Sequence, residues 1–130
     1  MAYIISEDSI GWQPIANTET TQKHPLGTIR RGYDKDTVAN GAGEFIYLKG
    51  VASTAVGTLV VYDQFLGTTT IAPATGGKGA VAVAMSANVA SQYGWYQISG
   101  AAAVKAPNAM VVGAEVFMLA ATPGSVDDAA

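Results

Sequence analysis

The single histidine of this chain, His24, is the first residue to consider as a catalytic group. A histidine acts as a general base only when another group orients its ring and a nucleophile lies within reach. The chain contains serines and carboxylates, but it has no Gly-x-Ser-x-Gly sequence that would mark a nucleophilic serine. It has no cysteine, which excludes disulfides, thiolate metal sites and thiol nucleophiles. We therefore expect His24 to be a loop residue and the chain not to be an enzyme.

Three further polar patterns are candidates for binding ions or phosphate, and the sequence argues against each. The Asp34-Lys35-Asp36 triplet supplies too few oxygen ligands for calcium, so we expect a solvated turn. The Gly76-Gly77-Lys78-Gly79 run is similar to a phosphate-binding loop, but positions 72 and 79 lack the required glycine and hydroxyl residue. We expect a flexible hairpin loop there, and a solvated tail at Asp127-Asp128. The sequence thus predicts no metal site and no cofactor.

Tyr93, Trp95 and Tyr96 form an aromatic cluster, and such rings can stack on sugars or bases. A nucleic-acid surface also needs positive charge, whereas this chain has a net charge of −3. We therefore expect no nucleic-acid partner, and the absence of a polybasic patch predicts no membrane partner. Since aromatic residues also dominate cores and interfaces, we expect Trp95 and Tyr96 in the core or in an oligomer interface.

The elements that position these residues divide into two parts by charge. Of the seven basic and ten acidic residues, nine lie in residues 1–36, where Pro14 and Pro25 disfavour a helix. We expect residues 1–36 to form an extended N-terminal arm that ends in a first strand at Thr28–Tyr33. The residues expected to dock this arm are apolar: Trp12, Ile15 and Leu26.

The remaining residues, 37–130, have the pattern of an all-β body. Between Gly50 and Ala114 only three residues are charged, which favours a surface that other protein covers. Short runs rich in β-branched and aromatic residues alternate with glycine-rich turns, and one helical turn is expected at Ser86–Gln92. The pattern predicts a small antiparallel β-barrel or β-sandwich with an extended N-terminal arm. The expected strands are Glu44–Lys49, Thr58–Tyr62, Thr68–Ala72, Ala80–Ala87, Gly94–Ser99, Ala101–Lys105, Met110–Val112 and Glu115–Leu119.

An ordered series of phrases in this body resembles a known family. The phrases are Glu44-Phe45-Ile46-Tyr47-Leu48-Lys49-Gly50, Gly57-Thr58-Leu59-Val60-Val61-Tyr62-Asp63, Gly79-Ala80-Val81-Ala82-Val83-Ala84, Gly94-Trp95-Tyr96-Gln97-Ile98-Ser99-Gly100 and Val112-Gly113-Ala114-Glu115-Val116-Phe117. In style and order, residues 44–119 resemble the small β-barrel capsid decoration (cement) proteins of tailed bacteriophages. The earlier Pro25-Leu26-Gly27-Thr28 is similar to the end of the N-terminal arm in such proteins.

The resemblance implies a structural role on the virion. Such proteins bind the outside of an assembled capsid, commonly as trimers and in some phages as dimers, and bridge neighbouring major capsid proteins. It implies a protein made in the host cytoplasm, with no enzymatic activity and no cofactor. The residues expected to contact the capsid lie in the arm and its strand: Trp12, Ile15, Leu26, Arg30 and Arg31.

Other classes of function remain open at this point. Tail-tube, fibre or baseplate modules of phages also use β-domains that assemble, so the sequence leaves head and tail undecided. A carbohydrate-binding β-module would use the rings of Tyr93, Trp95 and Tyr96. A small hydrolase is disfavoured because the sequence lacks recognisable parts of a catalytic triad.

Overall fold

The computed structural model describes residues 3–6, 13–36, 41–73, 77–119 and 121–128, and within these ranges every regular element is a strand. The strands are β1 (Tyr3–Ile5), β2 (Thr18–Glu19), β3 (Ile29–Asp34), β4 (Ala42–Lys49), β5 (Leu59–Tyr62), β6 (Thr69–Ile71), β7 (Ala80–Ala84), β8 (Tyr93–Ser99), β9 (Phe117–Met118) and β10 (Val126–Asp127). The predicted all-β class is therefore confirmed.

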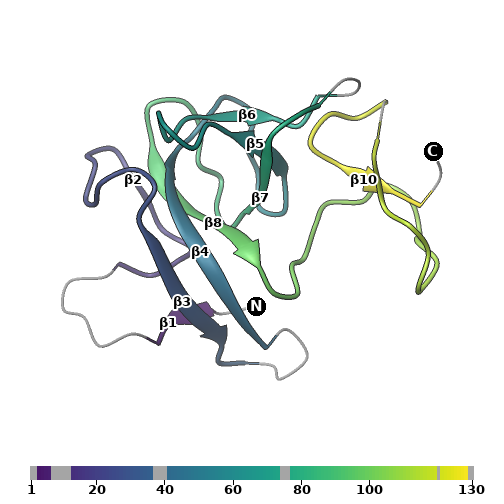
Figure 1. The fold of residues 1–130 in the computed structure, drawn as a ribbon, viewed down its shortest axis with the longest axis horizontal. Helices are drawn as coiled ribbons and strands as arrows, with labels where there is room; N and C mark the ends of the chain where they lie inside the picture. The colour runs from purple at the N-terminus through teal and green to yellow at the C-terminus, as the bar shows by residue number, and fades with distance from the viewer. Residues whose placement is uncertain (1–2, 7–12, 37–40, 74–76, 120, 129–130) are drawn as a thin grey trace.

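Eight of these strands form one antiparallel sheet in the order β1-β3-β4-β8-β7-β5-β6, with β2 paired to the start of β8 (Figure 1). The far end of this sheet returns to its middle. Lys49 at the end of β4 bridges Thr68 beside β6, and the Lys49 N–H donates to the Gly67 carbonyl at 2.9 Å. Strands β4, β8, β7, β5 and β6 consequently curl into a small barrel, which fits the predicted architecture.

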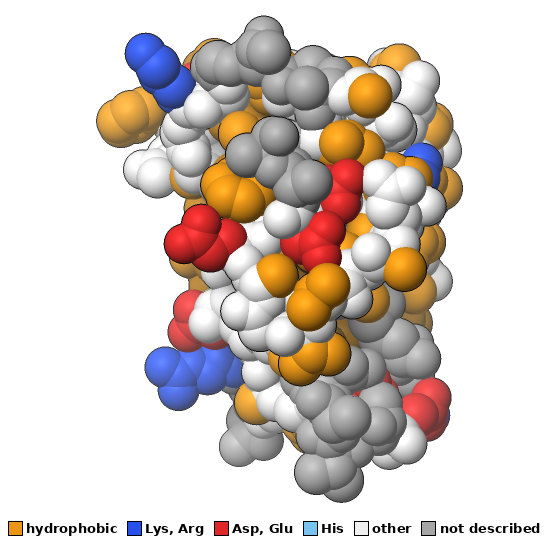
Figure 2. Space-filling view, turned by 90° about the vertical axis from the view of Figure 1, so that its right-hand side faces the viewer, with side chains coloured by type: hydrophobic (Ala, Val, Ile, Leu, Met, Phe, Trp, Pro, Cys, Tyr) orange, Lys and Arg blue, Asp and Glu red, His pale blue; other side chains and the backbone are white. Residues whose placement is uncertain are grey.

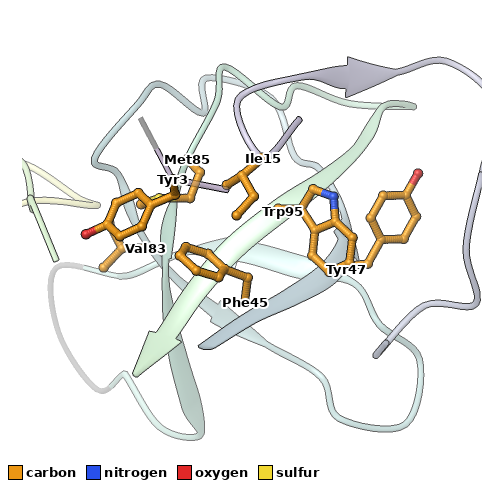
Figure 3. Close-up of a cluster of buried hydrophobic side chains, with 7 residues drawn as sticks. All are labelled: Tyr3, Ile15, Phe45, Tyr47, Val83, Met85 and Trp95. Carbon is orange, nitrogen blue, oxygen red and sulfur yellow. The ribbon is translucent and has the colours of Figure 1, made fainter. Parts of the chain in front are cut away.

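Hydrophobic residues pack on both faces of β4 and β8, because successive side chains of a strand point to opposite faces. The barrel interior holds Ile46, Leu48, Val60, Ala82, Ala84 and Tyr96. The outer cluster holds Tyr3, Ile15, Phe45, Tyr47, Val83, Met85 and Trp95 (Figure 3). The apolar alternation in the Glu44–Lys49 phrase thus serves two cores rather than one core and solvent.

The N-terminal segment supplies the cover over the outer cluster. β1 pairs with β3, and Ile15 from the following segment is only 2% exposed. Further along, the Gly27 N–H donates to the Tyr47 carbonyl at 2.8 Å. The expectation that apolar residues dock this segment is confirmed at Ile15, whereas Trp12 lies outside the described residues. The boundary between arm and body at residue 36 stays a prediction.

Several expected strands match the structure closely, but the C-terminal ones do not. Ala101–Lys105 and Met110–Val112 form no strand, and Glu115–Leu119 is reduced to the two residues of β9. Ala102 and Val104 do pack against the outer cluster, which explains the apolar alternation there. That segment makes isolated hydrogen bonds at Lys105, to the Gly57 carbonyl and from the Val126 N–H of β10, instead of a continuous ladder.

The expected helical turn at Ser86–Gln92 is also wrong. This stretch is an irregular loop that crosses the end of β4, where the Gly50 N–H donates to the Gln92 carbonyl at 2.8 Å. A side chain at position 50 would overlap the carbonyl oxygens of Asn88 and Val89, so only glycine fits this crossing. The fully buried Asn88 amide donates to the Tyr96 hydroxyl at 3.0 Å. This tertiary contact overrides the local preference for a helix.

Three loop predictions need correction. Asp34, expected in a solvated turn, is the last residue of β3 and is 6% exposed. The run at Gly76–Gly79, of which 77–79 are described, is not the turn of a hairpin, because β6 and β7 lie on opposite sides of β5. Asp127 is not part of a solvated tail. It is 6% exposed in β10 and accepts a hydrogen bond from the Asn108 amide at 2.7 Å.

Candidate interaction surfaces

The turn between β5 and β6, residues Asp63–Gly67, exposes two large apolar side chains and is called the β5–β6 tip below. Phe65 is 97% exposed and Leu66 is 66% exposed. One carboxylate oxygen of Asp63 accepts hydrogen bonds from the Phe65 and Leu66 N–H groups, at 2.8 and 2.9 Å. Gly67 closes the turn with a φ of +68°, a conformation that glycine adopts without strain. The tip therefore holds its apolar side chains on an ordered backbone.

The base of the β5–β6 tip is fixed to two other parts of the chain. Gly67 lies so close to Leu26 that a Cβ at position 67 would overlap the leucine side chain. The Thr69 hydroxyl donates to the Lys49 carbonyl at 2.7 Å, beside the β4–β6 bridge. Leu26, expected to contact a capsid, is half-buried between the outer cluster and this tip. Its packing links the N-terminal segment to the tip.

The C-terminal extension, residues 106–119, carries a second exposed apolar surface. Val112 is fully exposed, and Val111 and Val116 are 70% and 59% exposed. The Val111 N–H donates to a carboxylate oxygen of Asp128 at 2.6 Å, which ties the extension to the chain end. Figure 2 faces the side of the molecule on which β10 lies in Figure 1, and it shows hydrophobic side chains among acidic ones.

An apolar pocket of about 340 Å³ opens beside β1 and is called the β1 pocket below. Its deeper walls come from Tyr3, Ile15 and Met85, which are 7%, 2% and 4% exposed. Ile4, Pro14, Ala16 and the single charged residue Lys35 complete the described lining. The pocket is thus the exposed side of the outer cluster. In Figure 3, Tyr3 and Met85 lie at one end of that cluster and Tyr47 lies at the other.

The structure separates the residues predicted to contact a capsid. Ile15 is 2% exposed, so its side chain mainly holds the segment in place. Arg31 is exposed on β3 and forms a cross-strand ion pair with Glu44 at 3.5 Å. Arg30, half-buried, donates to the Ile29 carbonyl at 2.7 Å. Leu26, Arg30 and Arg31 stay predicted contacts, and Trp12 lies outside the described residues.

Trp95 and Tyr96 are both completely buried and belong to different clusters on opposite faces of β8. The sequence left open a core location or an oligomer-interface location for Trp95 and Tyr96, and the structure places both residues in the core. A sugar platform built from these rings with Tyr93 is not present, because a ligand cannot reach either residue. Burial is also the main reason why the pKa of Tyr96 is raised.

His24 packs on the outer cluster, with ring centres 5.1 Å from Tyr47 and 5.7 Å from Trp95. Its Nε2 donates to the side-chain oxygen of Gln13 at 2.6 Å. Burial lowers the pKa of His24, and the positive charge of Arg30 lowers it further. His24 lies in a loop, as expected, and its neutral ring covers part of the aromatic core.

The β5–β6 tip was missed by the sequence reasoning, although its signal is present. Asp63 begins and Gly67 ends a short run between two strand-like segments, which is the composition of a tight turn.

Among the described residues, no group of three or more histidines or carboxylates is placed to hold a metal ion. The same part of the chain contains no helical segment with the length and apolarity to cross a bilayer. No protein-family model, curated protein or solved structure matches the chain.

Proposed function

We propose that this chain is a structural virion protein that binds the outer surface of a phage capsid as a homo-oligomer, with a trimer favoured. In this role it joins neighbouring major capsid proteins and stabilises the shell. The proposal rests on the family resemblance of residues 44–119, and one structural observation carries it further. The C-terminal extension presents Val111, Val112 and Val116 to solvent, on a segment that the Val111 N–H ties to Asp128.

Exposed valines of this kind favour a protein partner over water. Full burial of one valine side chain contributes about 1.5–3 kcal/mol, and part of any such gain is offset by the loss of freedom on association. One extension therefore supports only a modest contact. Attachment of an oligomer at many equivalent sites makes modest contacts sufficient, because the separate contacts add through multivalency.

The N-terminal contacts expected from the sequence remain part of the proposal in a reduced form. Arg31 is accessible on β3, and Leu26 and Arg30 are half-buried. Ile15 acts indirectly, because its buried side chain fixes the segment that precedes β2. The capsid surface thus combines the C-terminal extension with the polar residues of β3.

A single charged substitution tests the role of the extension. Val112→Asp places a carboxylate on the fully exposed position, and Ala90→Asp adds the same charge at an exposed turn between β7 and β8. Both variants are mixed with particles of the encoding phage from which the chain has been removed, and bound protein is measured after sedimentation. We expect Val112→Asp to lower the apparent affinity about tenfold or more, and Ala90→Asp to bind as the unmodified chain does.

Two results would contradict this proposal. The first is failure of the unmodified chain to sediment with the heads at any concentration. The second is binding to isolated tails in preference to heads, which would favour the tail-module alternative. Equal affinity of Val112→Asp and Ala90→Asp would remove the extension from the capsid surface.

A further inference from the structure

We propose that Asp128 is a positioning residue for the capsid surface, because its carboxylate fixes the turn that carries Val112 before a partner binds. This inference rests on the proposed function and names the contact that shapes its surface. The Val111 N–H donates to the Asp128 carboxylate at 2.6 Å, across 17 residues of sequence. Hydrogen bonds from an N–H to a carboxylate are about twice as strong as neutral ones, so this contact restrains the backbone of the C-terminal extension.

Residues 111–114 form a tight turn, called the 111–114 turn below. The Ala114 N–H donates to the Val111 carbonyl at 3.2 Å, and Gly113 has a φ of +83°. Glycine adopts this φ without strain at the third position of a turn, which leaves Val112 at the second position. Val112 is fully exposed although the backbone around it is hydrogen-bonded. The turn is thus an ordered support for an exposed apolar side chain.

The segment that carries Asp128 is itself held on the barrel. The Leu59 N–H at the start of β5 donates to the Gly124 carbonyl at 2.8 Å. The Gly124 N–H donates in turn to the Ala72 carbonyl, just after β6, at 3.0 Å. Val126 in β10 is 7% exposed. The Asp128 carboxylate therefore connects the 111–114 turn to a backbone that the barrel fixes.

The neighbouring Asp127 aligns this acceptor. One oxygen of the Asp127 carboxylate accepts the Asp128 N–H at 2.8 Å, and the other accepts the Asn108 amide at 2.7 Å. Asp127 is 6% exposed, and hydrogen bonds are stronger where water is excluded. Two adjacent carboxylates thus hold the C-terminal extension at two points, Asn108 and Val111.

An ordered turn lowers the cost of association. When a partner covers a surface that is already fixed, less of the gain from burying Val112 is offset by lost freedom. Without the Asp128 acceptor, the Val111 N–H would bond to water and the 111–114 turn would sample other positions. Asp128 therefore acts on binding through the turn.

Two substitutions at position 128 separate the acceptor from its charge. Asp128→Ala removes the oxygen, whereas Asp128→Asn removes the negative charge and keeps an oxygen. Amide hydrogen exchange is followed by NMR, and binding to phage heads that lack the chain is measured by sedimentation of the same preparations. We expect Asp128→Ala to accelerate exchange at Val111 and to weaken head binding, each about tenfold. Asp128→Asn should stay within about threefold of the native chain in both measurements.

The amides of β4 and β8 are the control for folding, because these strands lie in the middle of the main sheet. We expect their protection to be the same in the native chain and in both variants. Loss of this protection in Asp128→Ala would show that Asp128 supports the whole fold, and the positioning role would be wrong.

The proposal is also overturned if Asp128→Ala leaves exchange at Val111 unchanged, or accelerates it without weakening head binding. Equal effects of Asp128→Asn and Asp128→Ala would overturn it too, since the charge rather than the acceptor would then be responsible. The exchange measurement needs no phage and is independent of the proposed function. If the native chain fails to bind heads while exchange responds as expected, the capsid role is wrong and the ordering of the turn by Asp128 stands.

Discussion

His24 shows how a single side chain couples the N-terminal segment to the core. Its neutral ring packs on Tyr47 and Trp95, and its lowered pKa means that the folded chain holds this proton less tightly than the unfolded chain. The stability that the neutral ring contributes is therefore complete above the unfolded value of 6.5 and is lost as the pH falls below it.

We expect the difference in free energy of unfolding between the native chain and His24→Asn to be largest at about pH 7.5 and smallest at about pH 5. The acid sensitivity of carboxylates is common to both proteins, so their difference isolates His24. Chemical denaturation at several pH values gives the comparison. Since the chain has one histidine, NMR titration also reads its pKa directly, and a value at or above 6.5 would refute this account of the residue.

At the same scale, Trp95 and Tyr96 show what the sequence could predict. Their adjacency in a strand-like run predicted that they lie on opposite faces, and their size predicted burial. Their location in the core could therefore be predicted from the sequence. The burial of Asn88 could not be predicted, because it depends on the close approach of its loop to β4, where the Asn88 amide also donates to the Leu48 carbonyl at 3.4 Å, 40 residues away in sequence. No local pattern marks an asparagine that is 0% exposed.

Among the elements, the β5–β6 tip depends on one acceptor. Asp63→Ala removes the oxygen that binds two backbone N–H groups, whereas Asp63→Asn keeps an oxygen in the same place. We expect Asp63→Ala to destabilise the chain by about 1 kcal/mol and to accelerate amide exchange at Phe65 and Leu66. Urea denaturation and hydrogen exchange measure these effects.

The asparagine variant is the control for this element. It should stay within about 0.5 kcal/mol of the native chain and keep most of the amide protection. Equal loss of protection in both variants would show that the carboxylate oxygen does not order the tip.

Strands were predicted correctly where the sequence has a strong apolar or β-branched pattern. They were missed where a strand exists only because it pairs with a neighbouring strand. The runs that became β3, β4, β5 and β8 carry their own apolar or β-branched pattern. β2 and β10 have two residues each and exist only through their partners, so their sequences hold too little signal. The Ala101–Lys105 run shows the converse, since it has the alternation of a strand but makes isolated hydrogen bonds at Lys105 and no ladder.

At the scale of the whole molecule, the charge-poor stretch Gly50–Ala114 supplies β5 to β8 of the barrel and part of the C-terminal extension. Much of its apolar content is therefore used inside the molecule. The most exposed apolar side chains of the stretch lie at two places, Phe65 and Leu66 at the β5–β6 tip and Val111 and Val112 in the C-terminal extension. We propose that the extension faces the capsid.

The central claim, that the chain is a structural protein of the outer capsid surface, is tested most directly by a cryo-electron microscopy reconstruction of the encoding phage particle. We expect density that fits the β4–β8 barrel on the outside of the head, repeated at equivalent positions and absent from particles that lack the chain. Density for the barrel only on the tail, or heads that are identical with and without the chain, would contradict the claim.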